Sequence, residues 1–181
     1  MTEIETGLDG VSLTVSPILP APELSRREKE KAAVQTILSH LITQPFSLTH
    51  TPEGAPRLVF GNGQTAPHIS VSHSRLLAAV ALSRDIAIGI DIEQPRPRLN
   101  DIAPKFLAPG EQGGDTNRLL RLWTAKEAVF KAAGIPGLLI THIIVDTSSA
   151  TASIASTQQT FSLKWIDYQD HLIALATPIS Q

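Results

Sequence analysis

Strong helix patterns occur in only two segments of this 181-residue chain, and short apolar runs of strand length surround both. The first helix pattern begins with the capping box SRRE at residues 25–28, in which the serine and the glutamate cap each other's amides, and continues to Leu41. The second covers residues 118–133 and stops at Gly134. Two helices among many short strands predict an α+β fold.

The apolar runs predict where these strands lie. We expect strands at residues 11–15, 57–60, 68–72, 77–83 and 86–92, with the last two forming a hairpin about a turn at 83–85. Residues 49–68 otherwise read as loop, and residues 101–112 as a short helix. A meander follows at residues 138–146, 151–156, 160–167 and 171–176. We therefore predict two similar halves, 1–86 and 87–181, each with a helix packed on a small, mainly antiparallel sheet.

Composition narrows the class of function. The formal net charge is -2, so no basic face for nucleic acid is expected. The chain has no cysteine, which favours a cytoplasmic setting and excludes thiolate metal sites. The first ten residues carry no apolar core of signal-peptide length, and no run approaches the ~20 apolar residues that span a bilayer. We expect no membrane association.

Two carboxylates stand at the end of the apolar strand AIGIDIE, residues 87–93. Asp91 and Glu93 are two positions apart, so their side chains share one face of the strand about 6.6 Å apart. Carboxylates this close repel each other, and a divalent cation held by oxygen ligands resolves the repulsion. A strand that simply ends in solvent is the alternative, and it is the simpler interpretation of the spacing alone. Gly89, beside Asp91, predicts room for a bulky ligand.

A stripe on the second helix carries the next candidates. Trp123, Glu127 and Lys131 recur at four-residue steps and share one side of the helix. A solvated salt bridge explains Glu127 and Lys131 but leaves the tryptophan exposed, whereas a stripe facing a cleft explains all three. In that position Glu127 can complete an oxygen cage, and Lys131 can neutralise a phosphate.

The strand end Ser72-His73-Ser74 supplies a third candidate. His73 can donate to an anion, although an ordinary surface histidine has the same pattern. Adjacent residues on a strand point to opposite faces, so Ser72 and His73 are not a nucleophile and its base. The residues alone therefore indicate a carboxylate-held divalent metal beside a phosphate ligand, a constellation that favours phosphoryl-type transfer.

The motifs SVSHS, GIDIE and WTAKEAVFKAAG, in this order, resemble the 4′-phosphopantetheinyl transferase superfamily, in its longer single-chain type with two halves. The triplet GAP at 54–56 and the run KFLAPGE ending at Glu111 stand where this family has related segments. The resemblance covers roughly residues 24–176.

The resemblance implies an active site in the cleft between the halves and a defined reaction. Such enzymes transfer the phosphopantetheine arm of coenzyme A to a serine of an apo acyl or peptidyl carrier protein and release adenosine 3′,5′-bisphosphate. The matching residues imply that Asp91, Glu93 and Glu127 hold Mg²⁺, that Glu127 takes the serine proton, and that Lys131 neutralises the pyrophosphate. They also imply that Ser72 and His73 contact the 3′-phosphate of coenzyme A.

One departure from the family is Ala55, which stands where a basic residue is common. Arg57, Arg26 or Arg27 can replace the missing contact. Carrier proteins of this family are usually acidic around their serine, so we expect docking on five cations of the second half: Arg96, Arg98, Lys105, Arg118 and Arg121. The alternative is that these are ordinary solubility charges. Two internal halves make a monomer sufficient.

Two other functions stay open at this point. One is a non-catalytic relative that binds coenzyme A or a carrier protein, and the other is a metal-dependent phosphohydrolase acting on free nucleotides.

Overall fold

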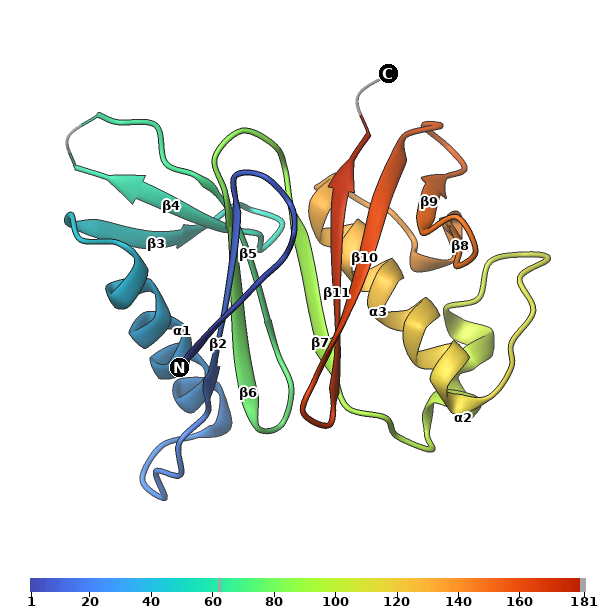
Figure 1. Cartoon of the computed structure of the whole chain (residues 1–181), viewed down its shortest axis with the longest axis horizontal. Coiled ribbons are helices and arrows are strands. Elements are labelled where there is room, and N and C mark those ends of the chain that lie inside the picture. Colours follow the sequence, from blue (N-terminus) through green and yellow to red (C-terminus); the bar gives the residue numbers. More distant parts are fainter. Residues whose placement is uncertain (62, 180–181) are drawn as a thin grey trace. The chain divides into compact units, whose positions relative to one another are not determined.

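The computed structural model describes residues 1–61 and 63–179 and divides into two compact units, Met1–Ile86 and Ala87–Gln181 (Figure 1). Each unit combines helix with antiparallel sheet, so the α+β class is confirmed. The cleft between the halves stays a prediction. Across residues 1–61 and 63–179, no helix combines the length and apolar composition needed to cross a bilayer.

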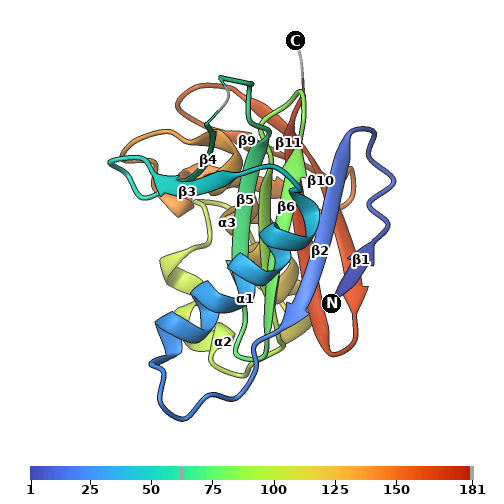
Figure 2. The same ribbon diagram turned by 90° about the vertical axis from the view of Figure 1, so that its left-hand side faces the viewer.

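The first unit is built on a four-stranded antiparallel sheet in the order β1-β2-β6-β5. Its strands are β1 (Thr2–Ile4), β2 (Val11–Pro17), β5 (His68–His73) and β6 (Leu77–Ser83). Helix α1 (Arg26–Leu41) lies against β2 and β6 (Figure 2). Its buried residues Val34, Ile37 and Leu38 form one apolar cluster with Val80 of β6 and with Leu58, which lies outside this sheet.

The start of α1 forms as its sequence predicts. The backbone N–H of Glu28 donates to Ser25 Oγ, and the backbone N–H of Ser25 donates to Glu28 Oε2 at 2.8 Å. These two bonds satisfy amide donors that the first turn of a helix leaves unpaired. The capping box is therefore confirmed.

A two-stranded hairpin follows α1, and only one of its two strands was predicted. Strand β4 (Pro56–Phe60) agrees with the predicted strand, but β3 (Phe46–His50) was missed and pairs with it. The start of the predicted loop at 49–68 is therefore strand, and Asn62 of that loop lies outside the described residues.

The second unit is a five-stranded antiparallel sheet in the order β7-β11-β10-β9-β8. Its strands are β7 (Gly89–Glu93), β8 (Ile143–Asp146), β9 (Thr151–Ile154), β10 (Thr160–Tyr168) and β11 (His171–Pro178). Strands β8 to β11 pair consecutively, so the meander is confirmed, although η2 (Ile140–His142) replaces the first part of its first strand.

Helix α3 (Thr116–Ala133) packs against β7 and β11 of this sheet. Asp115 caps its start by accepting from the Arg118 N–H, and Gly134 ends it in the left-handed region at φ 57°. Glycine adopts that conformation without steric cost, which explains the stop. The core beneath the helix includes Leu122, Val129, Phe161, Leu163 and Ala174.

The predicted hairpin of residues 77–83 and 86–92 is wrong. Strand β6 pairs with β2 on one side and β5 on the other, so it has no free edge for a further strand. Strand β7 pairs with β11, with Asp91 opposite Ala174, and belongs to the other unit. The short turn after β6 is therefore a connection between units.

The predicted helix over residues 101–112 is also wrong in its bounds. The chain forms α2 (Leu99–Ile102) and then the 3₁₀ turn η1 (Ala103–Lys105). Pro109 and Gly110 follow, and both residue types disfavour helix continuation. The Glu111 carboxylate instead accepts from the Ala108 N–H at 2.7 Å, which closes this segment on itself.

Candidate active site

Gly89 determines how closely β7 approaches α3. A β-carbon at this position would lie 1.8 Å from the Ala128 carbonyl oxygen and 2.7 Å from the Ala132 nitrogen. The glycine thus allows the strand backbone to rest directly on the helix backbone. The prediction that Gly89 makes room for a ligand is wrong, because helix α3 fills the space.

Asp91 lies on the same face of β7 as Gly89, two residues along, and its side chain meets α3. The residue is 5 % exposed. Lys131 Nζ donates to Asp91 Oδ1 at 3.0 Å and to the Ile90 carbonyl oxygen at 2.9 Å. Lys131, which was predicted to meet a phosphate, is therefore paired with Asp91, which was predicted to hold the metal.

Glu93 and Glu127 both lie half-buried beside this pair. Burial raises the pKa of Glu93, the Asp91 carboxylate raises it further, and Arg96, Trp123 and Lys131 oppose the rise. Arg96 Nη2 lies 2.5 Å from Glu93 Oε1. Burial also raises the pKa of Glu127, with Lys131 opposing and Asp91 adding to the rise. Asp91 therefore interacts electrostatically with both glutamates.

This donor set suits a hard divalent cation in its chemistry. It consists of carboxylate oxygens from one edge strand and one helix, and burial and repulsion hold back the ionisation of Glu93 and Glu127. Within the part of the chain that the structure describes, no three His, Cys, Asp or Glu side chains are gathered closely enough to hold a metal. Asp91 instead contacts Lys131, and Glu93 contacts Arg96.

Trp123, the first residue of the predicted stripe, has a packing role. Its ring meets Phe106 edge-on, with centroids 5.2 Å apart, and it is half-buried against the core of the second unit. The stripe therefore changes character along its length, from a packed ring at Trp123 to charged groups at Glu127 and Lys131.

Sequence reasoning missed an ion pair with a fully buried lysine on the other side of α3. Lys126 is 0 % exposed, and its Nζ lies 2.7 Å from Glu111 Oε2. Burial lowers the pKa of Lys126, and Glu111 opposes that fall. The signal was present, since both residues stand in the quoted motifs KFLAPGE and WTAKEAVFKAAG, but helical spacing placed Lys126 off the stripe.

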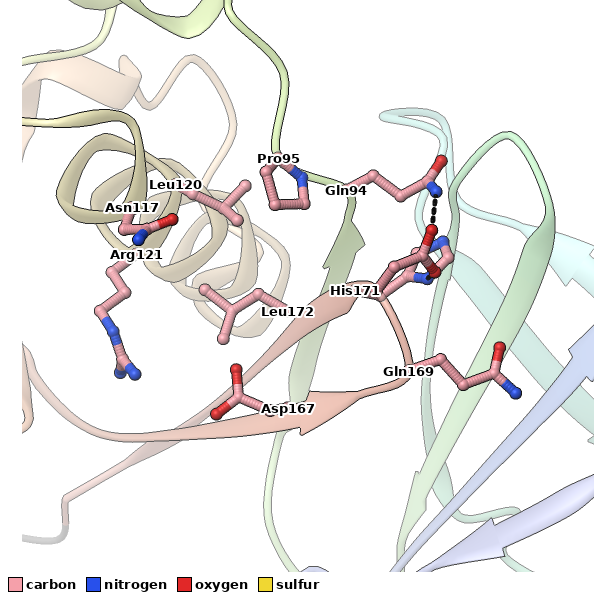
Figure 3. A pocket seen from close by; sticks show the side chains of 10 residues that line it. Gln94, Pro95, Asn117, Leu120, Arg121, Asp167, Gln169, His171 and Leu172 are labelled. Carbon is pink, nitrogen blue, oxygen red and sulfur yellow. Dashed lines mark hydrogen bonds and ion pairs between the residues drawn. The ribbon is translucent and has the colours of Figure 1, made fainter.

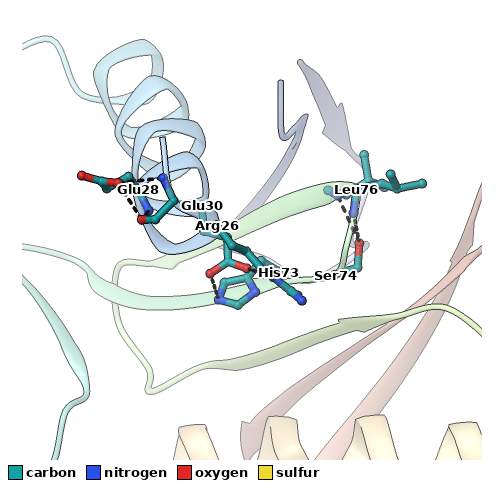
Figure 4. Close-up of polar contacts among 8 residues, drawn as sticks. Arg26, Glu28, Glu30, His73, Ser74 and Leu76 are labelled. Atoms are coloured by element: carbon teal, nitrogen blue, oxygen red, sulfur yellow. Dashed lines mark hydrogen bonds and ion pairs between the residues drawn. The ribbon is translucent and has the colours of Figure 1, made fainter. Parts of the chain in front are cut away.

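In the first unit, Ser72 and His73 face opposite sides of β5. Ser72 is buried, whereas His73 is exposed and its Nε2 lies 3.3 Å from Glu30 Oε2 (Figure 4). Glu30 Oε1 also pairs with Arg26 Nε at 2.7 Å. The structure does not bring the Ser72 and His73 side chains together, and it gives His73 a carboxylate partner.

Ala55, the departure from the family pattern, lies in the turn between β3 and β4. Its backbone N–H donates to Thr51 Oγ1 at 3.2 Å, and the residue is exposed. Arg57 on β4 is exposed close by in sequence, and Arg26 is already paired with Glu30.

A pocket of about 560 Å³ lies in the second unit at the turn between β10 and β11 (Figure 3). Gln94 Nε2 donates to Asp170 Oδ2 at 2.5 Å on its rim. Arg121 also lines it and lies over the Trp165 ring, with its guanidinium carbon 5.6 Å from the ring centroid. None of the predicted metal ligands lines this pocket.

All five cations predicted to dock a carrier protein are exposed. Arg96 is paired with Glu93, and Arg118 Nε donates to the Gln112 carbonyl oxygen at 3.4 Å. The second unit therefore presents basic side chains around the start of α3 and the segment before it.

Together these features define a class: an α+β protein in which an edge strand and a helix present carboxylates beside a lysine. Residues 87–176, just under half of the chain, match the family model of the 4′-phosphopantetheinyl transferase superfamily. The match covers the carboxylates Asp91, Glu93 and Glu127 and the lysine Lys131.

Two relatives agree with this family. A protein of Synechocystis sp. strain PCC 6803, whose name assigns it provisionally to the 4′-phosphopantetheinyl transferases, is 34 % identical over 103 residues, which are 51 % of this chain and 42 % of that protein. The 4′-phosphopantetheinyl transferase AcpT of Escherichia coli O157:H7 is 29 % identical over 138 residues, 68 % of this chain and 69 % of the relative. The match thus spans less than half of the first relative. Both names support the transferase class.

Proposed function

We propose that this chain transfers the 4′-phosphopantetheine arm of coenzyme A to a serine of an apo acyl or peptidyl carrier protein. The observation that carries the proposal is the Asp91–Lys131 pair, 3.0 Å long, with Glu93 and Glu127 interacting electrostatically with Asp91. These are the residue types that position a phosphate and neutralise its charge during transfer.

Glu127 is the proposed general base. In the transfer, a bond forms between the serine oxygen and the β-phosphorus of coenzyme A, and the bond from that phosphorus to the bridging oxygen breaks, so that adenosine 3′,5′-bisphosphate leaves. The serine proton passes to Glu127, directly or through one water. Its raised pKa supports this role, because a carboxylate with a higher pKa is a stronger base.

Asp91, Glu93 and Glu127 are the proposed magnesium ligands. A bound Mg²⁺ supplies a positive charge that stabilises the charge developing on the phosphate oxygens. Binding requires the glutamate side chains to rotate toward Asp91, since the described residues hold no gathered set of three ligands. Arg96 must then release Glu93, its partner in the ion pair.

Lys131 is the proposed pyrophosphate contact. Its side chain is 28 % exposed, so its ammonium group can reach a ligand while its stem stays packed. A cation that binds a phosphate must exchange its present partner, Asp91, for the ligand. That exchange makes the Asp91 carboxylate available to the metal, so the two events support each other.

Ser72 and His73 are the proposed contacts for the 3′-phosphate of coenzyme A. His73 is the better candidate, because it is exposed and lies in a cluster with Arg26. A phosphate there must displace Glu30 from the His73 ring or bind through Arg26.

The proposed partner is an acidic carrier protein, and the proposed setting is the cytoplasm. The exposed cations of the second unit support electrostatic docking. A monomer is sufficient for this proposal, and no nucleic acid or membrane takes part in it.

The test is incubation with coenzyme A, Mg²⁺ and a panel of apo carrier proteins, followed by intact mass of each carrier. A carrier that gains the phosphopantetheine mass, together with release of the bisphosphate, supports transfer. No gain on any carrier would contradict it. Bisphosphate release without a carrier would identify a phosphohydrolase instead.

The second candidate is a non-catalytic relative that binds coenzyme A or a carrier. Ala55 favours it, because the family often has a basic residue there. Calorimetric binding of coenzyme A without transfer to any carrier would select this candidate.

A further inference from the structure

Two lysines of α3 tie the helix to opposite edges of the five-stranded sheet. Lys131 reaches Asp91 and the Ile90 carbonyl oxygen on β7. Lys126 reaches Glu111 and the carbonyl oxygen of Ile143, the first residue of β8. Strands β7 and β8 are the two ends of the strand order. Each lysine therefore combines one carboxylate with one main-chain carbonyl at one sheet edge.

The Lys126 side chain is completely buried, the Glu111 side chain is 9 % exposed, and the carboxylate has several hydrogen-bond donors. Glu111 Oε2 accepts from the Ala108 N–H at 2.7 Å as well as from Lys126, and Glu111 Oε1 accepts from the Val145 N–H at 2.8 Å. Charges taken out of water need such partners, because their desolvation costs several kcal/mol per ion. The pair joins the segment before α3, the helix itself and β8.

Glu127 lies between Lys126 and Lys131 around the helix. Successive residues are about 100° apart around a helix, so the two lysines point about 140° apart, and together their contacts oppose rotation of α3. A rotation or slide of α3 would carry the Glu127 carboxylate away from Asp91. Displacements of about 1 Å can reduce catalysis about 100-fold.

We propose that Glu111 and Lys126 are positioning residues that hold Glu127 in register with Asp91 while Lys131 exchanges Asp91 for the pyrophosphate. The proposal rests on the proposed function, in which Lys131 changes partners. During that exchange Lys131 releases Asp91 on β7. Lys126 meets no ligand and keeps its contacts with Glu111 and with Ile143 of β8.

Stability and positioning can be separated by experiment. Replacing a buried ion pair by apolar residues of similar volume is often neutral or stabilising, whereas removing one partner is strongly destabilising. The double variant Glu111→Leu/Lys126→Met therefore keeps the packing and removes the directional bonds. Val129→Ala is the matched control, since it is buried on the same helix and removes packing but no charge.

The double variant is expected to stay folded but to melt at a lower temperature than the wild type, because the Ala108 and Val145 N–H groups lose the acceptor that Glu111 provides. It should bind Mn²⁺ about tenfold more weakly, as for lost outer-shell partners, with binding measured from the EPR signal of the free ion. Its kcat falls about tenfold or more, with the KM for coenzyme A changed less than about threefold. Val129→Ala loses stability but keeps both the Mn²⁺ affinity and kcat.

Wild-type Mn²⁺ affinity and kcat in the folded double variant would overturn the proposal, and so would equal losses in Val129→Ala. If circular dichroism shows the double variant unfolded, Glu111→Gln/Lys126→Met decides by the same two measurements, because it keeps the side-chain sizes, leaves no unpaired lysine charge and keeps one side-chain oxygen as an acceptor. If the wild type transfers no arm to any carrier, the proposed function fails, and the Mn²⁺ comparison alone then confirms or overturns the positioning role.

Discussion

At the scale of single residues, the half-buried Glu127 carboxylate is the proposed general base and also lowers the stability of the fold. Burial raises the pKa of Glu127, so its ionised form is disfavoured in the folded chain. A raised pKa contributes stability below the ordinary value of 4.5, and that contribution is lost as the pH rises through the folded-state pKa. At neutral pH the wild type therefore carries an unfavourable charge that its proposed function needs.

Glu127→Gln tests both sides of this balance. The variant is expected to lose transfer by about 100-fold or more, the usual range for a lost general base. It should also melt at a higher temperature than the wild type at pH 7, with the difference shrinking as the pH falls toward 4.5. Thermal melts across pH and the carrier mass assay measure these effects. The exposed Glu53→Gln serves as the control and should change neither.

Retained transfer in Glu127→Gln would remove this residue from the base and ligand roles. A melting difference that stays constant from about pH 4 to about pH 8 would show that the carboxylate is not the cause.

At the scale of elements, the approach of β7 to α3 depends on one glycine. Gly89→Ala places a β-carbon against the backbone of Ala128, which cannot rotate away as a side chain can. We expect a loss of about 3 kcal/mol or more in unfolding free energy, at the upper end for overpacking. Urea unfolding measures it. Gly61→Ala is the matched control, because a β-carbon there meets nothing within 4 Å. Similar losses in the two variants would contradict the close packing.

Elements set by local chemistry could be predicted from the sequence. The capping box of α1, the Gly134 stop of α3 and the meander of β8 to β11 each depend on neighbours in the chain. The pairing of β7 with β11 could not, because it joins residues about 80 positions apart and competes with a short turn that favours a hairpin. Strand β3 was missed although Phe46 and Leu48 alternate with Ser47 and Thr49, because the segment is short and runs into a stretch rich in proline, glycine and polar residues.

The candidate site followed the same division. The stripe of Glu127 and Lys131 and the acids of β7 were predictable from spacing, whereas the pairing of Lys131 with Asp91 was not. The Lys126–Glu111 pair was hidden because a charged residue off the stripe looks solvent-exposed in sequence, although it is 0 % exposed here. Contacts between distant segments decide which charges are buried.

At the scale of the whole molecule, a net charge of -2 does not attract an acidic partner by itself. Any electrostatic docking must come from a local group of cations. Arg98 and Arg118 are exposed in the second unit and lie outside the proposed metal and phosphate contacts. They can therefore be changed without touching the proposed chemistry.

Reversing both charges, Arg98→Glu/Arg118→Glu, should raise the KM for an acidic carrier about tenfold at low salt, because steering by local charge contributes about 10- to 1,000-fold to association. The KM for coenzyme A and the Mn²⁺ affinity should stay unchanged. The fold should tolerate the change Arg118→Glu, since an acidic side chain in the first turn of α3 interacts favourably with the helix dipole.

The control reverses two exposed cations of the first unit, Lys31→Glu/Arg84→Glu, and changes the net charge by the same amount. If docking depends on the local group, this control keeps the wild-type KM for the carrier, and the difference between the two variants disappears as salt screens the charges. If instead both variants raise that KM equally, overall charge governs the encounter, and the cations of the second unit are ordinary solubility charges.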